Sequence, residues 1–139
     1  MTGIELIKKW EQCRLAAYQD GGGVWTIGFG HTGPEVVEGL VWTLHEAESA
    51  LDKDYDAANN GVLRRVLIRL TENQEAALTS FVFNLGETNF AKSKLLVRVN
   101  EGKHVEAMLE LIQWHHDNGK KVKGLLRRRL EEASLYLTS

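Results

Sequence analysis

Residues 10–32 of the chain read WEQCRLAAYQDGGGVWTIGFGHT, and this stretch decides the fold predicted for the whole sequence. Three glycines, residues 21–23, separate two short segments, 17–19 and 24–27, that are alternating or rich in β-branched and aromatic residues. Because glycine permits a tight reversal of the chain, this pattern predicts a β-hairpin. The residues before it predict a helix that ends near Glu11, because apolar side chains recur there at helical spacing: Ile4, Leu6, Ile7 and Trp10.

Three polar residues of this stretch form a candidate catalytic set. Glu11 lies where the apolar face of the predicted helix runs out, and partial loss of hydration favours the protonated form that a proton donor needs. Asp20 lies at a wet turn, where a carboxylate should stay ionised. Thr26 has a stiff, β-branched side chain whose hydroxyl can hold a water molecule beside Asp20. A proton donor opposite an ionised carboxylate is the arrangement that glycoside hydrolysis requires.

The spacing of these residues resembles that of a known family. Glu11 is followed by eight residues, Asp20, five residues and Thr26, and then by the segment IGFGHT at 27–32, which looks like the bacteriophage-type lysozymes, the endolysin muramidases. Further similar segments lie at 83–86 (FNLG), 93–96 (SKLL), 100–102 (NEG), Trp114, 123–125 (KGL), 127–129 (RRR) and 135–137 (LYL). The resemblance implies that Glu11, Asp20 and Thr26 are the catalytic residues.

The same resemblance implies a substrate and the residues that hold it. The substrate would be the β-1,4 bond between N-acetylmuramic acid and N-acetylglucosamine in peptidoglycan. The acid and base residues favour cleavage with inversion, and a retaining route is the alternative if the two carboxyl groups lie only about 5 Å apart. Asn84 matches a family position whose amide contacts a sugar, with a structural hydrogen bond at the helix end as the alternative. Gly30, Trp25 and His31 are the other candidate substrate-binding residues. Trp42 is a further candidate for sugar stacking, with the protein core as the alternative. For His31 we favour a bracing role, in which the ring bonds an acid or the backbone.

Beyond the hairpin the sequence predicts a mostly helical α+β protein. Segments with helical spacing and helix-starting capping boxes predict helices at 43–58, 62–70, 71–85, 93–101, 103–114 and 124–137, with a stop at 59–61 and a loop containing one short strand or turn at 35–42. We expect a single lysozyme-like domain over residues 1–139. Its hairpin lobe (about 12–58) and helical lobe (about 59–139 plus the N-terminal helix) would enclose a cleft.

Composition narrows the functional classes. The 139 residues carry 17 basic and 19 acidic side chains, a balance that argues against a nucleic-acid partner. The single cysteine, Cys13, forms no internal disulfide, and no export signal or membrane-spanning stretch is apparent. We therefore expect a monomer without membrane insertion. It would remain in the host cytoplasm until release and then act on the cell wall, and the family resemblance implies a phage pore protein as the release partner.

No cofactor or metal ion is expected. His104, His115, His116 and Asp117 lack the spacing of a metal site on a helix, and the glycine segments lack the lysine or helix start of a phosphate-binding loop. The basic cluster at 120–129 is compatible with contact to an anionic wall or with a solvated helix face. Two rival functions remain open, a wall-binding module without activity and a glycosidase that acts on chitin-like polymers.

Overall fold

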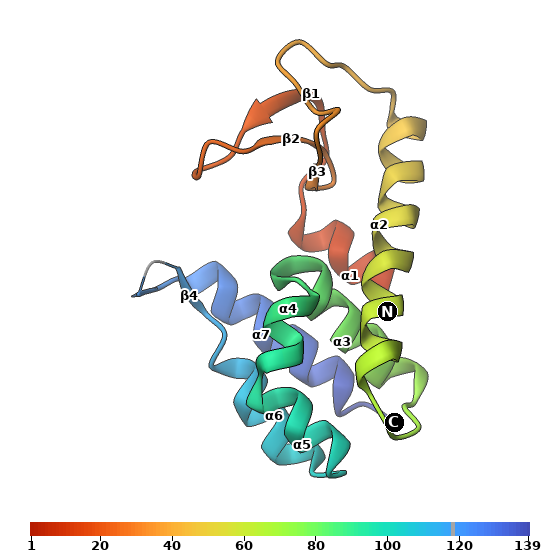
Figure 1. Cartoon of the computed structure of the whole chain (residues 1–139), viewed down its shortest axis with the longest axis vertical. Helices are drawn as coiled ribbons and strands as arrows, with labels where there is room; N and C mark the ends of the chain where they lie inside the picture. The colour runs from red at the N-terminus through yellow and green to blue at the C-terminus, as the bar shows by residue number, and fades with distance from the viewer. Residues whose placement is uncertain (118) are drawn as a thin grey trace. The chain divides into compact units, whose positions relative to one another are not determined.

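The computed structural model describes residues 1–117 and 119–139, which fall into two compact units. Residues Ile4–Asp56 form the first, here called the ribbon unit. It holds α1 (Gly3–Trp10) from Ile4 onward, β1 (Arg14–Gln19), β2 (Trp25–Gly28), β3 (His31–Thr32) and the start of α2 (Leu44–Arg65) (Figure 1). The sequence had grouped the N-terminal helix with the helical lobe, whereas most of α1 clusters here with the strands.

The second unit, here called the helical unit, consists of Met1–Gly3 and Ala57–Ser139. Its elements after the end of α2 are α3 (Glu72–Leu85), α4 (Glu87–Lys92), α5 (Lys94–Asn100), α6 (His104–Ile112), β4 (His116–Asp117), β5 (Lys120–Lys121) and α7 (Lys123–Tyr136). The predicted α+β, mostly helical class is confirmed. The short helix α4 and the β4–β5 pair were not predicted, because six-residue and two-residue elements are too short to show a period.

The strands of the ribbon unit form a three-stranded antiparallel sheet in the order β1, β2, β3. Tyr18 pairs with Thr26 and Gln19 with Trp25, which confirms the predicted hairpin. The third strand was not predicted: there Thr32 pairs with Thr26 and His31 with Ile27. Thr26 therefore has a neighbouring strand on both sides, and a bridge between Ala16 and Val41 fastens the 35–42 loop to β1.

Helix α2 continues through the segment 59–61 that was predicted to end it, and runs on to Arg65. Packing overrides the poor helix propensity of these residues. Asn59 donates a hydrogen bond to the Thr79 hydroxyl at 3.1 Å, and Val62 is fully buried. At Gly61 a β-carbon would lie 3.2 Å from the Glu87 carboxylate, so glycine makes room for that side chain.

The predicted helix at 62–70 is correspondingly wrong beyond Arg65. Helix α2 ends at Arg65 because the side chain of Asn100 hydrogen-bonds to the backbone of Arg65 and Leu67. Asn100 Oδ1 accepts a hydrogen bond from the Leu67 N–H at 2.7 Å, and its Nδ2 donates to the Arg65 carbonyl at 3.1 Å. An asparagine more than thirty residues away is a signal that periodicity alone does not contain.

Two predicted capping boxes are present. Thr43 and Glu46 exchange side-chain-to-backbone hydrogen bonds at the start of α2, and Thr71 and Gln74 do so at the start of α3. Each box satisfies two backbone N–H groups that have no partner within the helix. Helix α3 ends as predicted at Gly86, whose φ of 91° suits glycine and whose N–H donates to the Val82 carbonyl.

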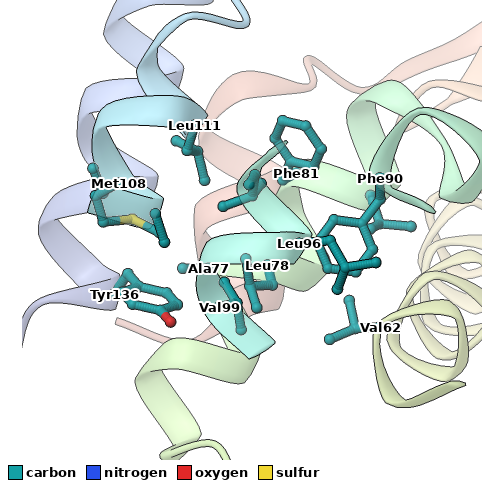
Figure 2. Packing of buried hydrophobic residues seen from close by; sticks show 14 of the residues in the cluster. Val62, Ala77, Leu78, Phe81, Phe90, Leu96, Val99, Met108, Leu111 and Tyr136 are labelled. Carbon is teal, nitrogen blue, oxygen red and sulfur yellow. The ribbon is translucent and has the colours of Figure 1, made fainter. Parts of the chain in front are cut away.

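The helical unit is built around an apolar core that α3 crosses. Phe81, Leu78 and Ala77 of α3 are fully buried, and Figure 2 shows them among side chains from the neighbouring helices. The cluster also contains Ala58, Val62, Val82, Phe90, Leu95, Leu96, Val99, Ala107, Met108, Leu111, Ala133 and Tyr136. Burying each large apolar side chain contributes about 1.5–3 kcal/mol. Trp114 adds an edge-to-face contact with Phe81, with ring centroids 5.7 Å apart, which places it with the core.

Candidate active site

Asp20 fixes the turn between β1 and β2 with its own carboxylate. Its Oδ1 atom accepts hydrogen bonds from the backbone N–H groups of Gly22 and Val24, both at 2.9 Å. The Asp20 N–H in turn donates to the Val24 carbonyl at 2.9 Å. Gly23 supports the reversal with a φ of 79°. Both side-chain bonds go to Oδ1, so among the described residues Oδ2 is the oxygen left to bind water or substrate.

Thr26 is tied to Asp20 through one backbone carbonyl. Its hydroxyl donates to Val24 O at 3.0 Å, and this is the same oxygen that accepts the Asp20 N–H. The side chain is only 5% exposed and lies on the central strand of the sheet. With its proton committed to the carbonyl, the Thr26 hydroxyl keeps its lone pairs to accept a hydrogen bond from water.

Glu11 follows α1 directly, and its N–H closes the last turn of the helix onto Ile7 O at 2.7 Å. Its carboxylate lies against Gly30, where a β-carbon would be 2.8 Å from Oε2. Real β-carbons do not approach an atom that closely, and the φ of 75° at Gly30 also favours glycine. Gly30 thus forms a wall for the Glu11 carboxylate, which is a contact that spacing in the sequence did not predict.

His31, the residue after Gly30, is held between two carboxylates. Its Nδ1 lies 2.7 Å from Asp54 Oδ2 on α2, and its Nε2 lies 2.6 Å from Glu35 Oε1 in the loop after β3. We call these three residues the His31 brace. The bracing role that we favoured for His31 from the sequence agrees with this geometry, whereas its role in binding substrate stays a prediction. Neither acid was singled out in the sequence: Asp54 is 23 positions from His31 and gives no local signal, and Glu35, four positions away, lies in a segment without a clear period.

The charges of the brace shift the pKa values of its members. Partial burial alone would lower the pKa of His31, but the hydrogen bonds and charges of Glu35 and Asp54 outweigh it and raise that pKa above the usual 6.5. The hydrogen bond with His31 lowers the pKa of Glu35. Both shifts favour the charged pair.

The two tryptophans of the ribbon unit differ in their surroundings. Trp25 is half-buried on β2, opposite Gln19, and stays a candidate for stacking on a sugar. Trp42 packs its six-membered ring against Gly28, where a β-carbon would lie 3.1 Å from the ring, and its ring centroid is 5.4 Å from that of His31. The contacts of Trp42 are therefore those of a packing residue beside the brace.

Asn84, the remaining substrate-binding candidate, lies in the helical unit at the end of α3. Its Oδ1 accepts a hydrogen bond from Arg129 Nη2 at 2.8 Å. Arg129 also forms an ion pair with Glu132 at 2.6 Å, with both side chains fully buried, and Ser80 donates to Glu132 at 2.6 Å. Burial raises the pKa of Glu132 and lowers that of Arg129, because each charged form loses hydration. This buried network fixes the orientation of the Asn84 amide.

The described residues contain no group of histidine, cysteine and acidic side chains arranged to hold a metal ion. Over the same part of the chain, no helix combines the length and the apolar character needed to cross a bilayer. Cys13 is exposed and free.

Comparison with known proteins gives a consistent result. The model of the phage lysozyme family matches residues 8–132, which include Glu11, Asp20 and Thr26. The chain belongs to this family. It is 38% identical to the endolysin of Acyrthosiphon pisum secondary endosymbiont phage 1, over 96% of this chain and 94% of that protein. It is also 38% identical to the endolysin of Bacillus phage PZA, but there it spans only 53% of the relative's length.

A solved structure of a muramidase domain shows the same fold. The muramidase domain of SpmX from Asticaccaulis excentricus superimposes with a TM-score of 0.91 at 40% identity, covering 99% of this chain and 95% of that one. The predicted lysozyme-like fold is therefore confirmed. The predicted lobe boundaries and the cleft between the lobes stay predictions.

Proposed function

We propose that this chain is a muramidase, a glycoside hydrolase that cuts the β-1,4 bond between N-acetylmuramic acid and N-acetylglucosamine in peptidoglycan. The observation that carries the proposal is the arrangement of Glu11, Asp20 and Thr26 in one unit. Asp20 and Thr26 share the Val24 carbonyl, and Glu11 lies against Gly30. Membership of the phage lysozyme family supports the choice of substrate.

Glu11 is the proposed general acid. Its protonated carboxyl would give its proton to the leaving oxygen of the glycosidic bond, which makes the alcohol a better leaving group. The wall formed by Gly30 limits where the Glu11 carboxylate can move. A fixed position matters because effective proton transfer needs the donor within hydrogen-bond reach of the oxygen it protonates.

Asp20 and Thr26 are proposed to hold the attacking water on the opposite face of the sugar. The water would donate one hydrogen bond to the Thr26 hydroxyl, whose own proton is bound by Val24 O, and the other to Asp20 Oδ2. As the water attacks, Asp20 would take up its proton as general base. This route inverts the anomeric configuration, and NMR of freshly released product distinguishes it from a retaining route through a covalent sugar on Asp20.

Four residues are proposed to bind the glycan outside the reacting bond. Trp25 would stack on a sugar face, and Asn84, oriented by Arg129, would bond a sugar amide or hydroxyl. Gly30 would contact the glycan through its backbone, and His31 would contact it through the exposed side of the brace. Acting on the wall as a monomer, the protein would cause host lysis. We further propose that it is held in the host cytoplasm until a phage pore protein releases it.

The test of the proposal is the isosteric variant Glu11→Gln, which keeps the shape of the side chain but carries no proton to donate. We expect the rate at which a peptidoglycan suspension clears to fall by at least about a hundredfold. Glu5→Gln, on the preceding helix α1, is the matched control and should clear at the wild-type rate. Circular dichroism of both variants checks that they fold.

Two rival functions make different predictions in the same experiment. A binding module would pull down wall fragments equally well with and without Glu11, and wild-type protein would release no reducing sugar. A chitin-type glycosidase would release sugar from chitin oligomers but not from peptidoglycan. Undiminished clearing by Glu11→Gln would remove Glu11 as the acid.

A further inference from the structure

His31 lies between two residues that adjoin predicted catalytic residues. Gly30, just before it, lies against the Glu11 carboxylate, and Thr32, just after it, pairs with Thr26. Successive side chains of a strand point to opposite faces, so the His31 ring and the Thr32 side chain lie on opposite faces of β3. The ring itself is attached to α2 through Asp54 and to the following loop through Glu35.

The geometry of the brace requires a doubly protonated ring. A carboxylate only accepts hydrogen bonds, and a neutral imidazole carries one N–H donor, whereas an imidazolium carries two. Both ring nitrogens of His31 lie within 2.7 Å of a carboxylate oxygen, so both must carry a proton for the two contacts to be favourable. Loss of one proton must break one contact.

We propose that His31, Asp54 and Glu35 position Glu11 and Thr26 for the reaction, and that only the doubly bonded imidazolium does so. This inference rests on the proposed function. His31 acts as a positioning residue through Gly30 and Thr32, without touching the substrate in this role. When the ring loses a proton, the Glu35 contact is the one to open, because the Glu35 side chain is 57% exposed and that of Asp54 only 33%.

The surroundings of the ring set the direction of the pH dependence. His31, Glu35 and Asp54 line a pocket of about 400 Å³, so protons reach the ring from solvent. The other charged or titratable groups of its lining are His45, Glu46 and Lys53 of α2, and Glu46 is already bound to the Thr43 N–H. The raised pKa of His31 means that the imidazolium is fully present below 6.5 and is lost as the pH rises through the folded-state value. Activity should therefore fall on the alkaline side.

The test uses two variants that keep the shape of the brace but remove a charge, Glu35→Gln and Asp54→Asn. Neutral partners stabilise the imidazolium less, so the alkaline midpoint of the clearing rate should move down by about one pH unit. The drop above that midpoint should appear in kcat, because misplaced catalytic groups slow the reaction. A change confined to KM would instead reflect the glycan contact proposed for His31 and would overturn the positioning role. Matched controls are Glu38→Gln in the same loop and Asp52→Asn on the same helix, which change the same charge outside the brace.

NMR separates a failure of this inference from a failure of the proposed function. In the wild-type protein the ring nitrogens of His31 and the amide signals of Gly30 and Thr32 should titrate with one common midpoint, and that midpoint should fall in Glu35→Gln. This result needs no catalysis, so it stands even if the protein clears no walls. Midpoints in the brace variants equal to those of their controls, or Gly30 and Thr32 signals that do not follow His31, would overturn the inference.

Discussion

In the helical unit, Phe81 and its neighbours form a dry apolar cluster, and the buried ion pair of Arg129 and Glu132 lies on α7. In the ribbon unit, the contacts around the predicted catalytic residues are polar and partly open to water: the Asp20 turn and the His31 brace. Apolar packing is tolerant of small changes and independent of pH, whereas directional hydrogen bonds fix individual atoms but titrate. The comparison teaches that stability and precise placement come from different parts of this chain.

The largest expected effect on folding comes from the buried charge in the helical unit. The isosteric change Glu132→Gln leaves Arg129 as a buried cation without its counterion, which should lower the free energy of unfolding by about 3–5 kcal/mol. Urea denaturation at neutral pH measures the change. The matched control is Glu101→Gln, because Arg98 of α5 and Glu101, the C-cap of that helix, have the same i,i+3 spacing but are exposed.

The exposed control should show a change too small to resolve, because solvent screens such pairs. If Glu132→Gln and Glu101→Gln lowered the free energy of unfolding equally, the loss would come from breaking an ion pair and not from burying an unpaired charge. Since Arg129 also holds Asn84, the Glu132 variant should bind glycan more weakly as well.

The next effect tests the apolar core on a single helix. Leu111 and Leu109 both lie on α6, the first fully buried and the second 59% exposed. Leu111→Ala should cost about 2–5 kcal/mol of unfolding free energy, through lost burial and the cavity left behind, whereas Leu109→Ala should stay within about 0.5 kcal/mol. At a temperature where both variants are folded, clearing per molecule should match the wild type. A large loss of activity in folded Leu111→Ala would show that the core also places catalytic atoms.

The distance along the chain between interacting residues explains which features were predictable from the sequence. The glycines at 21–23 and the capping boxes at Thr43 and Thr71 act within a few residues, so the hairpin and both helix starts were predicted. Asn100 and Asp54 act on segments or side chains at least 23 positions away, which no local pattern connects to them. For this reason the end of α2 and the bond between His31 and Asp54 were missed, although a bracing role for His31 was predicted.

The candidate site follows the same rule. Glu11, Asp20 and Thr26 were picked out by chemistry and by spacing within one short stretch, and their catalytic roles stay proposals. The contact between Gly30 and Glu11 joins residues 19 positions apart and depends on how β3 returns past the end of α1. Spacing identifies the reacting groups, whereas the atoms that hold them are visible only in the folded chain.

The smallest expected effect on folding comes from two glycines, and it separates backbone strain from the placement of the Glu11 carboxylate. Gly30 and Gly102 have nearly the same backbone conformation, with φ of 75° and 73°, but a β-carbon would meet Glu11 at 2.8 Å in the first and nothing within 4 Å in the second. Alanine at either position should cost about 1–2 kcal/mol of stability, because an L-residue is strained there.

Only Gly30→Ala also displaces the Glu11 carboxylate, so its clearing rate should fall about a hundredfold while Gly102→Ala keeps the wild-type rate. Denaturation curves establish the equal strain and turbidity measures the rates. Equal rates in the two variants would mean that the Glu11 carboxylate does not need its glycine wall.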